Sequence, residues 1–225
     1  MNGTRRAFSA TLPVMAGYMV LGMGFGMLMN SRGYGIWLPV AMSLFIYAGS
    51  MQYAAIDLLS GGAGVLTCAL TTLLVNARHL FYGITMIDAY RDTGKYKPYL
   101  MLTLTDETYS LLCNDTAPDD GTGKTRYRLL VSLFDHAWWV LGTAIGAVIG
   151  QLLPFDPVGI DFALTALFLT ILVDNLRERA SRRPAIMGLG MSAVCLVILG
   201  PDSFLLPAMA GTVCLLLLTR RGVRA

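Results

Sequence analysis

Three polar residues, Asn76, Arg78 and His79, interrupt an otherwise apolar stretch at positions 71–86 (TTLLVNARHLFYGITM). An arginine binds a carboxylate through two parallel hydrogen bonds, and a histidine exchanges protons near neutral pH. A charged residue in the middle of a membrane-spanning helix costs about 2.5–3.5 kcal/mol, so it is expected to face protein or water. The stretch therefore predicts an internal polar site. The alternative is that Arg78 lies near a helix end, where it reaches the lipid headgroups or pairs structurally with an acid.

If residues 66–85 form one helix, its residues separate onto two faces at about 100° per residue. Tyr82 shares the polar face with Arg78 and His79, and Asn76 lies at its boundary. The opposite face consists of leucine, isoleucine, phenylalanine and alanine. We expect the apolar face to contact lipid and the polar face to contact protein or water.

Two neighbouring acids, Asp106 and Glu107, lie in a shorter and more polar segment at 98–113, where they share one helical face with other polar residues. Two acids at membrane depth need a cation or water, because an unpaired buried charge is prohibitive. Arg78 and His79 are the nearest cationic candidates in the sequence. We therefore expect these acids to face Arg78. The alternative is that they begin an exposed loop and are solvated.

Other segments contain weaker candidates. Ser50 and Gln52 belong to the motif YAGSMQ, whose glycine marks backbone that could be unwound to bind a ligand, although tight packing explains the same glycine. Asp135 and Trp139 lie in LFDHAWWVLGTAIGAVIG. Asp135 could relay protons, or it could be solvated near the start of its segment. The glycines of this segment, Gly142 and Gly146, are expected to let another helix pack closely.

The composition indicates a membrane protein. Of the 225 residues, 55% are hydrophobic and 14% are charged, whereas soluble domains carry roughly 25% charged residues. The mean hydropathy is +0.60. Because a span needs about 20 apolar residues, we expect seven segments, with 98–113 as a marginal eighth, at 8–29, 36–59, 65–87, 129–153, 158–176, 185–199 and 204–218. The prediction is an all-α polytopic membrane protein with seven or eight membrane-embedded helices, some broken or re-entrant, in one transmembrane domain over residues 1–225.

Basic residues indicate the orientation in the membrane. Arg5 and Arg6 precede the first segment, RERASRR lies at 177–183 and RRGVR at 220–224. The positive-inside rule places these stretches, and with them both termini, in the cytoplasm. If every segment crosses, the loop DAYRDTGKYKPY lies outside despite its basic residues. A re-entrant third segment, broken at Asn76–His79, would return this loop to the inside. We see no basic patch that would bind nucleic acid.

Two similar motifs suggest an internal repeat. VLGMGFG begins at Val20 and VLGTAIG begins at Val140, an offset of 120 residues. The same offset overlays the second segment on the segment at 158–176, which would make two related halves, a common construction in secondary transporters. Chance similarity between short glycine-rich motifs is the alternative.

Five motifs between Tyr47 and Leu169 together resemble the AzlC family of branched-chain amino-acid permeases: YAGSMQYAA, TTLLVNARHLFYG, LTDETYSL, WWVLGTAIGAVIG and GIDFALTALFL. The resemblance implies export of branched-chain or other hydrophobic amino acids across the bacterial inner membrane. It also implies a small membrane partner of the AzlD type.

A zwitterionic substrate needs a partner for each of its charges when it leaves water. We expect Arg78 to bind the carboxylate and Asp106 or Glu107 to bind the ammonium group. The other expected substrate contacts are Asn76, Tyr82, Ser50, Gln52 and Trp139, and the expected proton carriers are His79, Glu107 and Asp135.

The chain contains no GxxxxGK[ST] motif, so we expect proton-driven transport and not ATP-driven transport. The four cysteines are well separated within apolar segments, and no metal site, cofactor or catalytic residue is expected. Two alternatives to transport remain. One is a structural subunit of another membrane protein. The other is an intramembrane serine hydrolase that uses Ser50 with His79 or His136 as the base.

Overall fold

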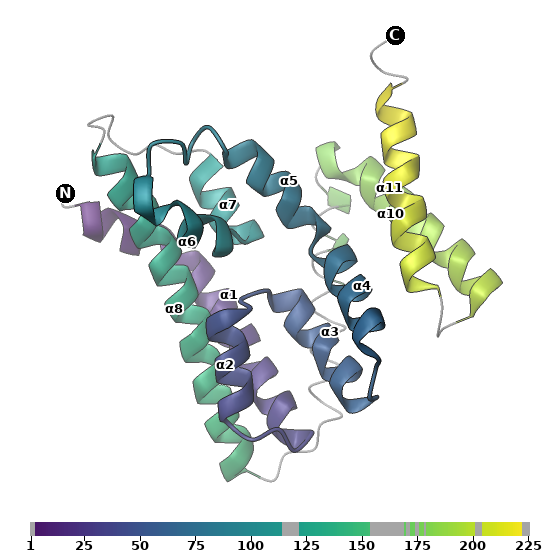
Figure 1. Cartoon of the computed structure of the whole chain (residues 1–225), viewed down its shortest axis with the longest axis horizontal. Coiled ribbons are helices and arrows are strands. Elements are labelled where there is room, and N and C mark those ends of the chain that lie inside the picture. Colours follow the sequence, from purple (N-terminus) through teal and green to yellow (C-terminus); the bar gives the residue numbers. More distant parts are fainter. Residues whose placement is uncertain are drawn as a thin grey trace. The chain divides into compact units, whose positions relative to one another are not determined.

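The computed structural model describes residues 3–113, 122–153, 169, 172–173, 176–177, 179–200 and 204–221. All regular structure in these ranges is helical, as the sequence predicts (Figure 1). The chain forms two compact units, residues 1–157 and residues 158–225. In the second unit, α10 (Arg179–Leu199) packs against α11 (Leu205–Arg221). The expected segment at 158–176 lies largely outside the described residues.

Three helices in the described ranges are long and apolar enough to cross a membrane. They are α1 (Gly3–Ser31), α8 (Thr122–Leu152) and α10. A fourth candidate is the pair of α4 (Val65–Val75) and α5 (Ala77–Met86), which are bent by 49° at a short break. The described part of the chain therefore holds three or four candidate spans, and the larger number expected from the sequence stays a prediction.

The first unit is built around α1 and α8, which run in the same direction. Phe8 packs on Phe134 and Tyr18 packs on Trp139, so residue numbers increase in the same direction along both helices and the pair is parallel. Glycines make this contact close. A Cβ atom on Gly22 would lie 2.9 Å from the Thr143 amide nitrogen, and one on Gly142 would lie 2.9 Å from the Tyr18 carbonyl oxygen. The predicted packing role of these glycines is confirmed, and the two similar motifs are the surfaces in contact.

The second apolar segment is a hairpin of two short helices, α2 (Trp37–Phe45) and α3 (Gly49–Ser60). Ser43 of α2 bonds to Thr143 of α8, whereas Asp57, near the end of α3, lies 3.9 Å from Arg32, which follows α1. The hairpin therefore enters and leaves at the C-terminal end of α1, and the expected single span at 36–59 is wrong. Helices of 9 and 12 residues reach only about 14 and 18 Å, half of the roughly 30 Å hydrocarbon thickness.

The turn of this hairpin lies at Ile46–Ala48, where the YAGSMQ motif begins. Tyr47 has a positive φ of 45°, and α3 starts at Gly49. A Cβ atom on Gly49 would lie 3.1 Å from the Trp139 ring, so a larger residue would push this turn away from α8. The sequence left unwound backbone and tight packing as alternatives for this motif, and the structure shows both, the turn at Tyr47 and the close contact of Gly49 with Trp139.

The third segment, α4 and α5, leads from one end of the first unit to the other. It begins after the turn that follows Asp57, and it ends where Met86 and Tyr90 pack with Ala7 of α1 and Tyr127 of α8. The loop at 88–97 therefore lies at the N-terminal end of α1. The sequence left two places open for this loop, outside if every segment crosses and inside if the third segment is re-entrant. The structure places the loop with the N-terminal end of α1, and the segment that folds back is the second.

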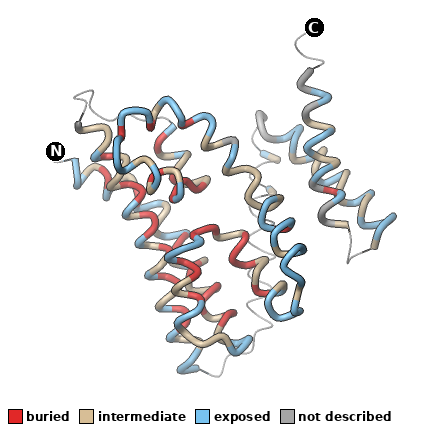
Figure 2. The backbone as a smooth tube through the Cα atoms, in the orientation of Figure 1, coloured by how far each residue is buried: buried red, intermediate tan, exposed pale blue. Residues whose placement is uncertain are grey.

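The helical wheel drawn over 66–85 is partly correct. The helix breaks at Asn76, whose φ and ψ are −90° and 3°, so the stretch is two helices and not one. Leucine and isoleucine residues of the expected lipid face are exposed, and Arg78, His79 and Tyr82 are half-buried. A single helix would also put Thr67, Thr72 and Thr85 on the polar face, but these three residues are exposed with the apolar residues. Figure 2 shows the exposure along α4 and the burial along α1 and α8.

The polar segment at 98–113 forms a second hairpin, α6 (Lys97–Leu102) and α7 (Asp106–Cys113), preceded by the short 3-10 helix η1 (Gly94–Tyr96). Leu100 and Leu112 pack with Ala7 near the start of α1, whereas Thr105, between the helices, bonds to Tyr18 near the middle of α1. This hairpin therefore enters from the end opposite to the first hairpin. Tyr47 and Ala48 in the first turn and residues 103–105 in the second are buried by protein, where membranes tolerate non-helical backbone.

Candidate functional site

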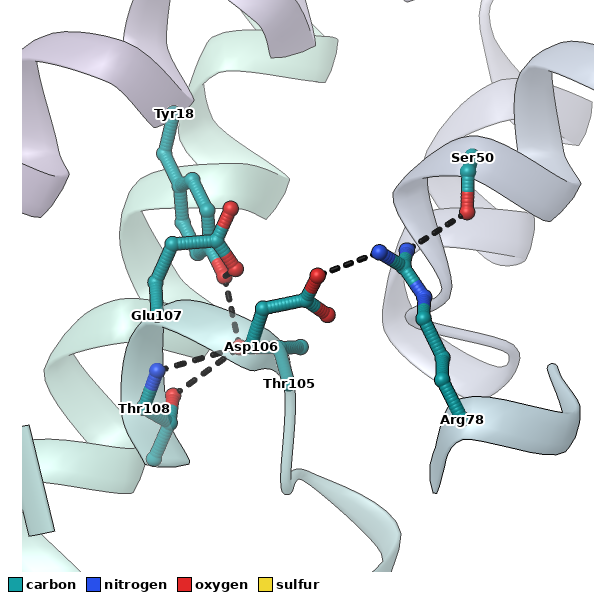
Figure 3. Close-up of polar contacts among 7 residues, drawn as sticks. All are labelled: Tyr18, Ser50, Arg78, Thr105, Asp106, Glu107 and Thr108. Atoms are coloured by element: carbon teal, nitrogen blue, oxygen red, sulfur yellow. Dashed lines mark hydrogen bonds and ion pairs between the residues drawn. The ribbon is translucent and has the colours of Figure 1, made fainter. Parts of the chain in front are cut away.

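Three helices begin close together and place one functional side chain each in a common cluster. Ser50, Arg78 and Asp106 lie at the N-terminal ends of α3, α5 and α7 (Figure 3). The guanidinium of Arg78 donates through Nη1 to Asp106 Oδ2 and through Nη2 to Ser50 Oγ, at 2.7 Å. The Asp106 carboxylate is additionally favoured by the positive end of its own helix. The structure thus brings together three predicted site residues that are far apart in the sequence.

The ion pair is accessible within the described structure. The exposed fractions of the Arg78 and Asp106 side chains are 40% and 37%. A half-exposed pair of this kind does not carry the desolvation cost of a fully buried one, so its two charges can exchange partners more readily. The cluster can therefore bind a ligand that offers both a negative and a positive group.

Glu107 turns away from Arg78 and bonds to α1. Tyr18 donates from its hydroxyl to Glu107 Oε2 at 2.8 Å and lies 2.7 Å from Thr105 Oγ1. The expectation that both acids face Arg78 therefore holds for Asp106 only. Glu107 is directed elsewhere because adjacent residues at the start of a helix point about 100° apart.

Asp135 is fully buried and not solvated at the entrance of its segment. Its Oδ2 accepts a hydrogen bond of 2.8 Å from Thr108 Oγ1, and Thr108 in turn accepts one of 3.1 Å from Thr105. Glu107 and Asp135, both expected to carry protons, are thus joined through hydroxyl groups.

Gln52 and Trp139 bond to each other in a separate buried cluster. Trp139 Nε1 donates to Gln52 Oε1 at 2.9 Å, and Gln52 Nε2 donates to Ser43 Oγ, also at 2.9 Å. Ser43 Oγ lies 2.8 Å from Thr143 Oγ1. In the structure these groups satisfy one another, which holds the first hairpin on α8.

The remaining predicted residues lie along α5. Asn76 occupies the break before the helix, and its Oδ1 atom is buried with no hydrogen-bond partner among the described residues. His79 meets the Tyr82 ring edge-on at 6.1 Å, and Tyr82 stacks on Tyr109 of α7 at 4.8 Å. These rings lie beside the ion pair and hold α5 against α7.

The sequence reasoning missed three residues of the polar network, Tyr18, Thr105 and Thr108. Their only sequence signal is a hydroxyl group within an apolar run, which is common in membrane helices and does not identify a partner. For the hydrolase alternative, the recorded partner of Ser50 is Arg78, whereas His136 lies near Tyr99 and the Ser43 carbonyl oxygen. Across the described ranges, no group of three or more histidine, cysteine, aspartate or glutamate side chains is placed to hold a metal ion.

The described residues define an all-helical protein with three or four candidate membrane spans, two opposed hairpins and a charged cluster where three helices begin. Broken helices of this kind are common in secondary transporters. The AzlC protein family model matches residues 13–153. The chain belongs to the AzlC family.

Several relatives match nearly the whole chain. It is 38% identical to the "Branched-chain amino acid transport protein AzlC" of Bacillus subtilis, over 96% of this chain and 85% of that protein. It is also 38% identical to an "Uncharacterized membrane protein" of Helicobacter pylori J99, over 98% of this chain and 96% of the relative. The "Inner membrane protein YgaZ" of Escherichia coli is 26% identical over 76% of this chain and 72% of that protein. No solved structure gives a significant match.

Proposed function

We propose that this protein is a secondary transporter that exports branched-chain or other hydrophobic amino acids across the bacterial inner membrane. The observation that carries the proposal is the Arg78–Asp106 ion pair at the meeting point of three helix N-termini. The 38% identical relative of B. subtilis bears the name of a branched-chain amino acid transport protein, which supports a transport role and this substrate class.

Binding would proceed by exchange of partners within the ion pair. The substrate carboxylate replaces Asp106 on the Arg78 guanidinium and also meets the Ser50 hydroxyl, and the substrate ammonium group pairs with the released Asp106 carboxylate. One ion pair becomes two, so no charge is left unpaired in the membrane. The guanidinium suits this exchange because its planar N–H groups bind a carboxylate in a two-pronged contact.

The aliphatic side chain of the substrate would lie along the neighbouring aromatic residues. Tyr82 and Asn76 border the ion pair on α5, and the Gln52 and Trp139 cluster borders the turn that precedes Ser50. Net transport against a gradient requires a second driving species, for which His79, Glu107 and Asp135 are the candidate proton carriers.

The wider arrangement belongs to the same proposal. Seven or eight membrane-embedded segments in a single transmembrane domain, with both termini in the cytoplasm, follow from the hydropathy and the basic residues. The two similar glycine motifs are consistent with related halves, and a small AzlD-type membrane protein would complete the transporter.

Counterflow in liposomes tests this function. The purified chain, with and without its small partner, is reconstituted with unlabelled amino acid inside, and uptake of radiolabelled valine, leucine and methionine is measured. We expect saturable exchange in the wild type and a loss of about tenfold or more in Arg78→Ala and Asp106→Asn, since charged hydrogen bonds contribute about 1.5–3 kcal/mol each.

Arg32→Ala is the matched control, because it removes the same charge from an exposed pair, Arg32 with Asp57. Exchange that is unaffected by the loss of Arg78 would exclude the proposed site. Absence of exchange under every condition would favour the structural-subunit alternative. An imposed pH gradient, acid on either side, then decides the direction and the coupling.

A further inference from the structure

Five side chains form an unbroken line of oxygen atoms between the two acids Glu107 and Asp135. The intervening groups are the hydroxyls of Tyr18, Thr105 and Thr108, which come from α1, the hairpin turn and α7 (Figure 3). The four successive oxygen–oxygen distances from Glu107 to Asp135 are 2.8, 2.7, 3.1 and 2.8 Å. Each is within the normal range for an O–H···O hydrogen bond or close to it.

The number of protons in this line reveals its charge state. Four contacts need four protons, but each hydroxyl supplies only one, which makes three. If both acids were ionised, one contact would hold two oxygen atoms with no hydrogen between them. The fourth proton must therefore reside on a carboxyl group. One additional proton, on either acid, completes all four hydrogen bonds.

The two ends of the line differ in their access to water. Glu107 is half-buried, whereas Asp135 is fully buried and its Oδ1 atom has no partner among the described residues. An ionised carboxylate in that position would leave one of its oxygen atoms unsolvated, which is costly. The neutral form needs fewer partners, so burial favours the state with the proton on Asp135. In that state the hydroxyls of Thr105 and Thr108 rotate to donate toward Glu107 instead of toward Asp135. Glu107 is the end that exchanges with water.

We propose that Glu107 and Asp135 share one proton through the hydroxyl groups of Tyr18, Thr105 and Thr108, and that these five residues form the proton pathway of the transporter. As a pathway for coupling, the inference rests on the proposed function. As a proton-sharing chain, it stands on the geometry alone.

Transfer along the chain balances at every atom. Glu107 gives its proton to the Tyr18 oxygen, Tyr18 gives its own to Thr105, Thr105 to Thr108, and Thr108 to Asp135 Oδ2. Glu107 is left as a carboxylate that can take another proton from water, and each hydroxyl has replaced the proton that it passed on by the one it received from its neighbour. The reverse sequence returns the proton. Other ionisable groups lie around this hydrogen-bonded line. They are Tyr47 from the turn of the first hairpin, Arg78 and Tyr82 from α5, Tyr99 from α6, Asp106 from α7 and His136 from α8.

Infrared spectroscopy of the purified, reconstituted protein tests the shared proton without any transport. The protonated Asp135 gives a carboxylic acid carbonyl band at neutral pH, which Asp135→Asn removes and Asp57→Asn, at an exposed acid, does not. After a change into D₂O, the band shifts as its proton is replaced. In Thr108→Val and Tyr18→Phe we expect this exchange to be about tenfold or more slower, because one hydrogen bond in the path is lost.

Two further variants separate the pathway from general packing. Thr108→Ser keeps the hydroxyl and should restore fast exchange. Thr103→Val removes an equally buried hydroxyl whose single bond within the described residues goes to the Tyr99 carbonyl oxygen, and it should leave the exchange unchanged. If Thr108→Val fails to fold, Tyr18→Phe and Thr105→Val test the same line.

The outcomes for the pathway and for the transport function are distinct. If no band depends on Asp135, or if the exchange rate is the same in Thr108→Val and wild type, the pathway is wrong whatever the counterflow experiment gives. If hydrogen exchange behaves as expected and valine counterflow is absent, the proposed substrate is wrong and the proposed proton pathway is still supported. In a functional transporter, Thr108→Val should keep counterflow and lose accumulation driven by a pH gradient.

Discussion

At the scale of single residues, the site depends on one guanidinium that holds two partners at once. Arg78 bonds to Asp106 with one nitrogen and to Ser50 with the other. This geometry requires the planar, forked head group of arginine, because the ammonium group of a lysine is a single point of charge. The shape of the cation is therefore as important as its sign.

Replacement of Arg78 by lysine should separate these two properties. Arg78→Lys keeps the positive charge but cannot bind a carboxylate in a two-pronged contact, so we expect the substrate concentration for half-maximal counterflow to rise by about tenfold. The measurement is valine counterflow over a range of concentrations. Wild-type behaviour of the lysine variant would show that charge alone is sufficient.

Gln52 offers a second test at this scale, because its amide is already satisfied by Trp139 and Ser43. Gln52→Leu leaves the buried N–H group of Trp139 unpaired and removes one of the two partners of Ser43, and we expect a loss of about 1–3 kcal/mol in stability. Thermal unfolding in detergent measures it, with Gln151→Leu at an exposed glutamine of α8 as the control. An unchanged melting temperature combined with weaker substrate affinity would instead make Gln52 a direct substrate ligand.

At the scale of elements, the glycine contact between α1 and α8 positions everything else. Both hairpins pack on this pair, the first through Ser43 and Gln52 and the second through Thr105 and Thr108. A change in the distance between α1 and α8 would therefore displace both helix breaks together.

An added methyl group at this contact should disturb the whole unit. A Cβ atom on Gly146 would overlap the backbone of Met23, which cannot move as a flexible side chain can. We expect Gly146→Ala to cost about 1–3 kcal/mol, the usual penalty for overpacking. Gly17→Ala is the control, because no heavy atom lies within 4 Å of its added Cβ atom. Equal melting temperatures for the two variants would contradict the observed packing.

At the scale of the whole molecule, the hairpin at 37–60 decides the side of the membrane on which later segments emerge. Because this segment returns to the end where it entered, the loop at 88–97 lies with the N-terminal end of α1. Arg128 of α8 holds the same loop by donating to the Ala89 carbonyl oxygen. The basic residues of the loop therefore join Arg5 and Arg6 at one face, as the positive-inside rule favours.

Labelling of single cysteines tests this arrangement. In a chain whose four natural cysteines are replaced, we expect Lys95→Cys to react with a membrane-impermeant maleimide in inverted vesicles only. Asp57→Cys should react in intact cells with a permeable outer membrane. Both positions are exposed, so access depends on the side of the membrane. Reaction of both cysteines from the same side would contradict the hairpin.

The amino-acid sequence by itself determined the membrane class, the helical architecture and the need of Arg78 for a polar partner. These properties follow from local composition, because a charge within an apolar helix has few alternatives to a polar partner. The pairing of Arg78 with Asp106 was also predictable, since opposite charges at membrane depth need each other. The glycine contact followed from the spacing of small residues on one helical face.

Only the tertiary structure decided which segment folds back and which hydroxyl groups meet. Hydropathy measures how apolar a segment is and not where its chain turns, so residues 36–59 are equally suited to a span and to a hairpin. Tyr18 and Thr105 are 87 positions apart, and a hydroxyl group, unlike a charge, does not demand a particular partner. Their contact exists because α1 and the second hairpin pack on α8, which is a property of the assembled helices and not of any single one.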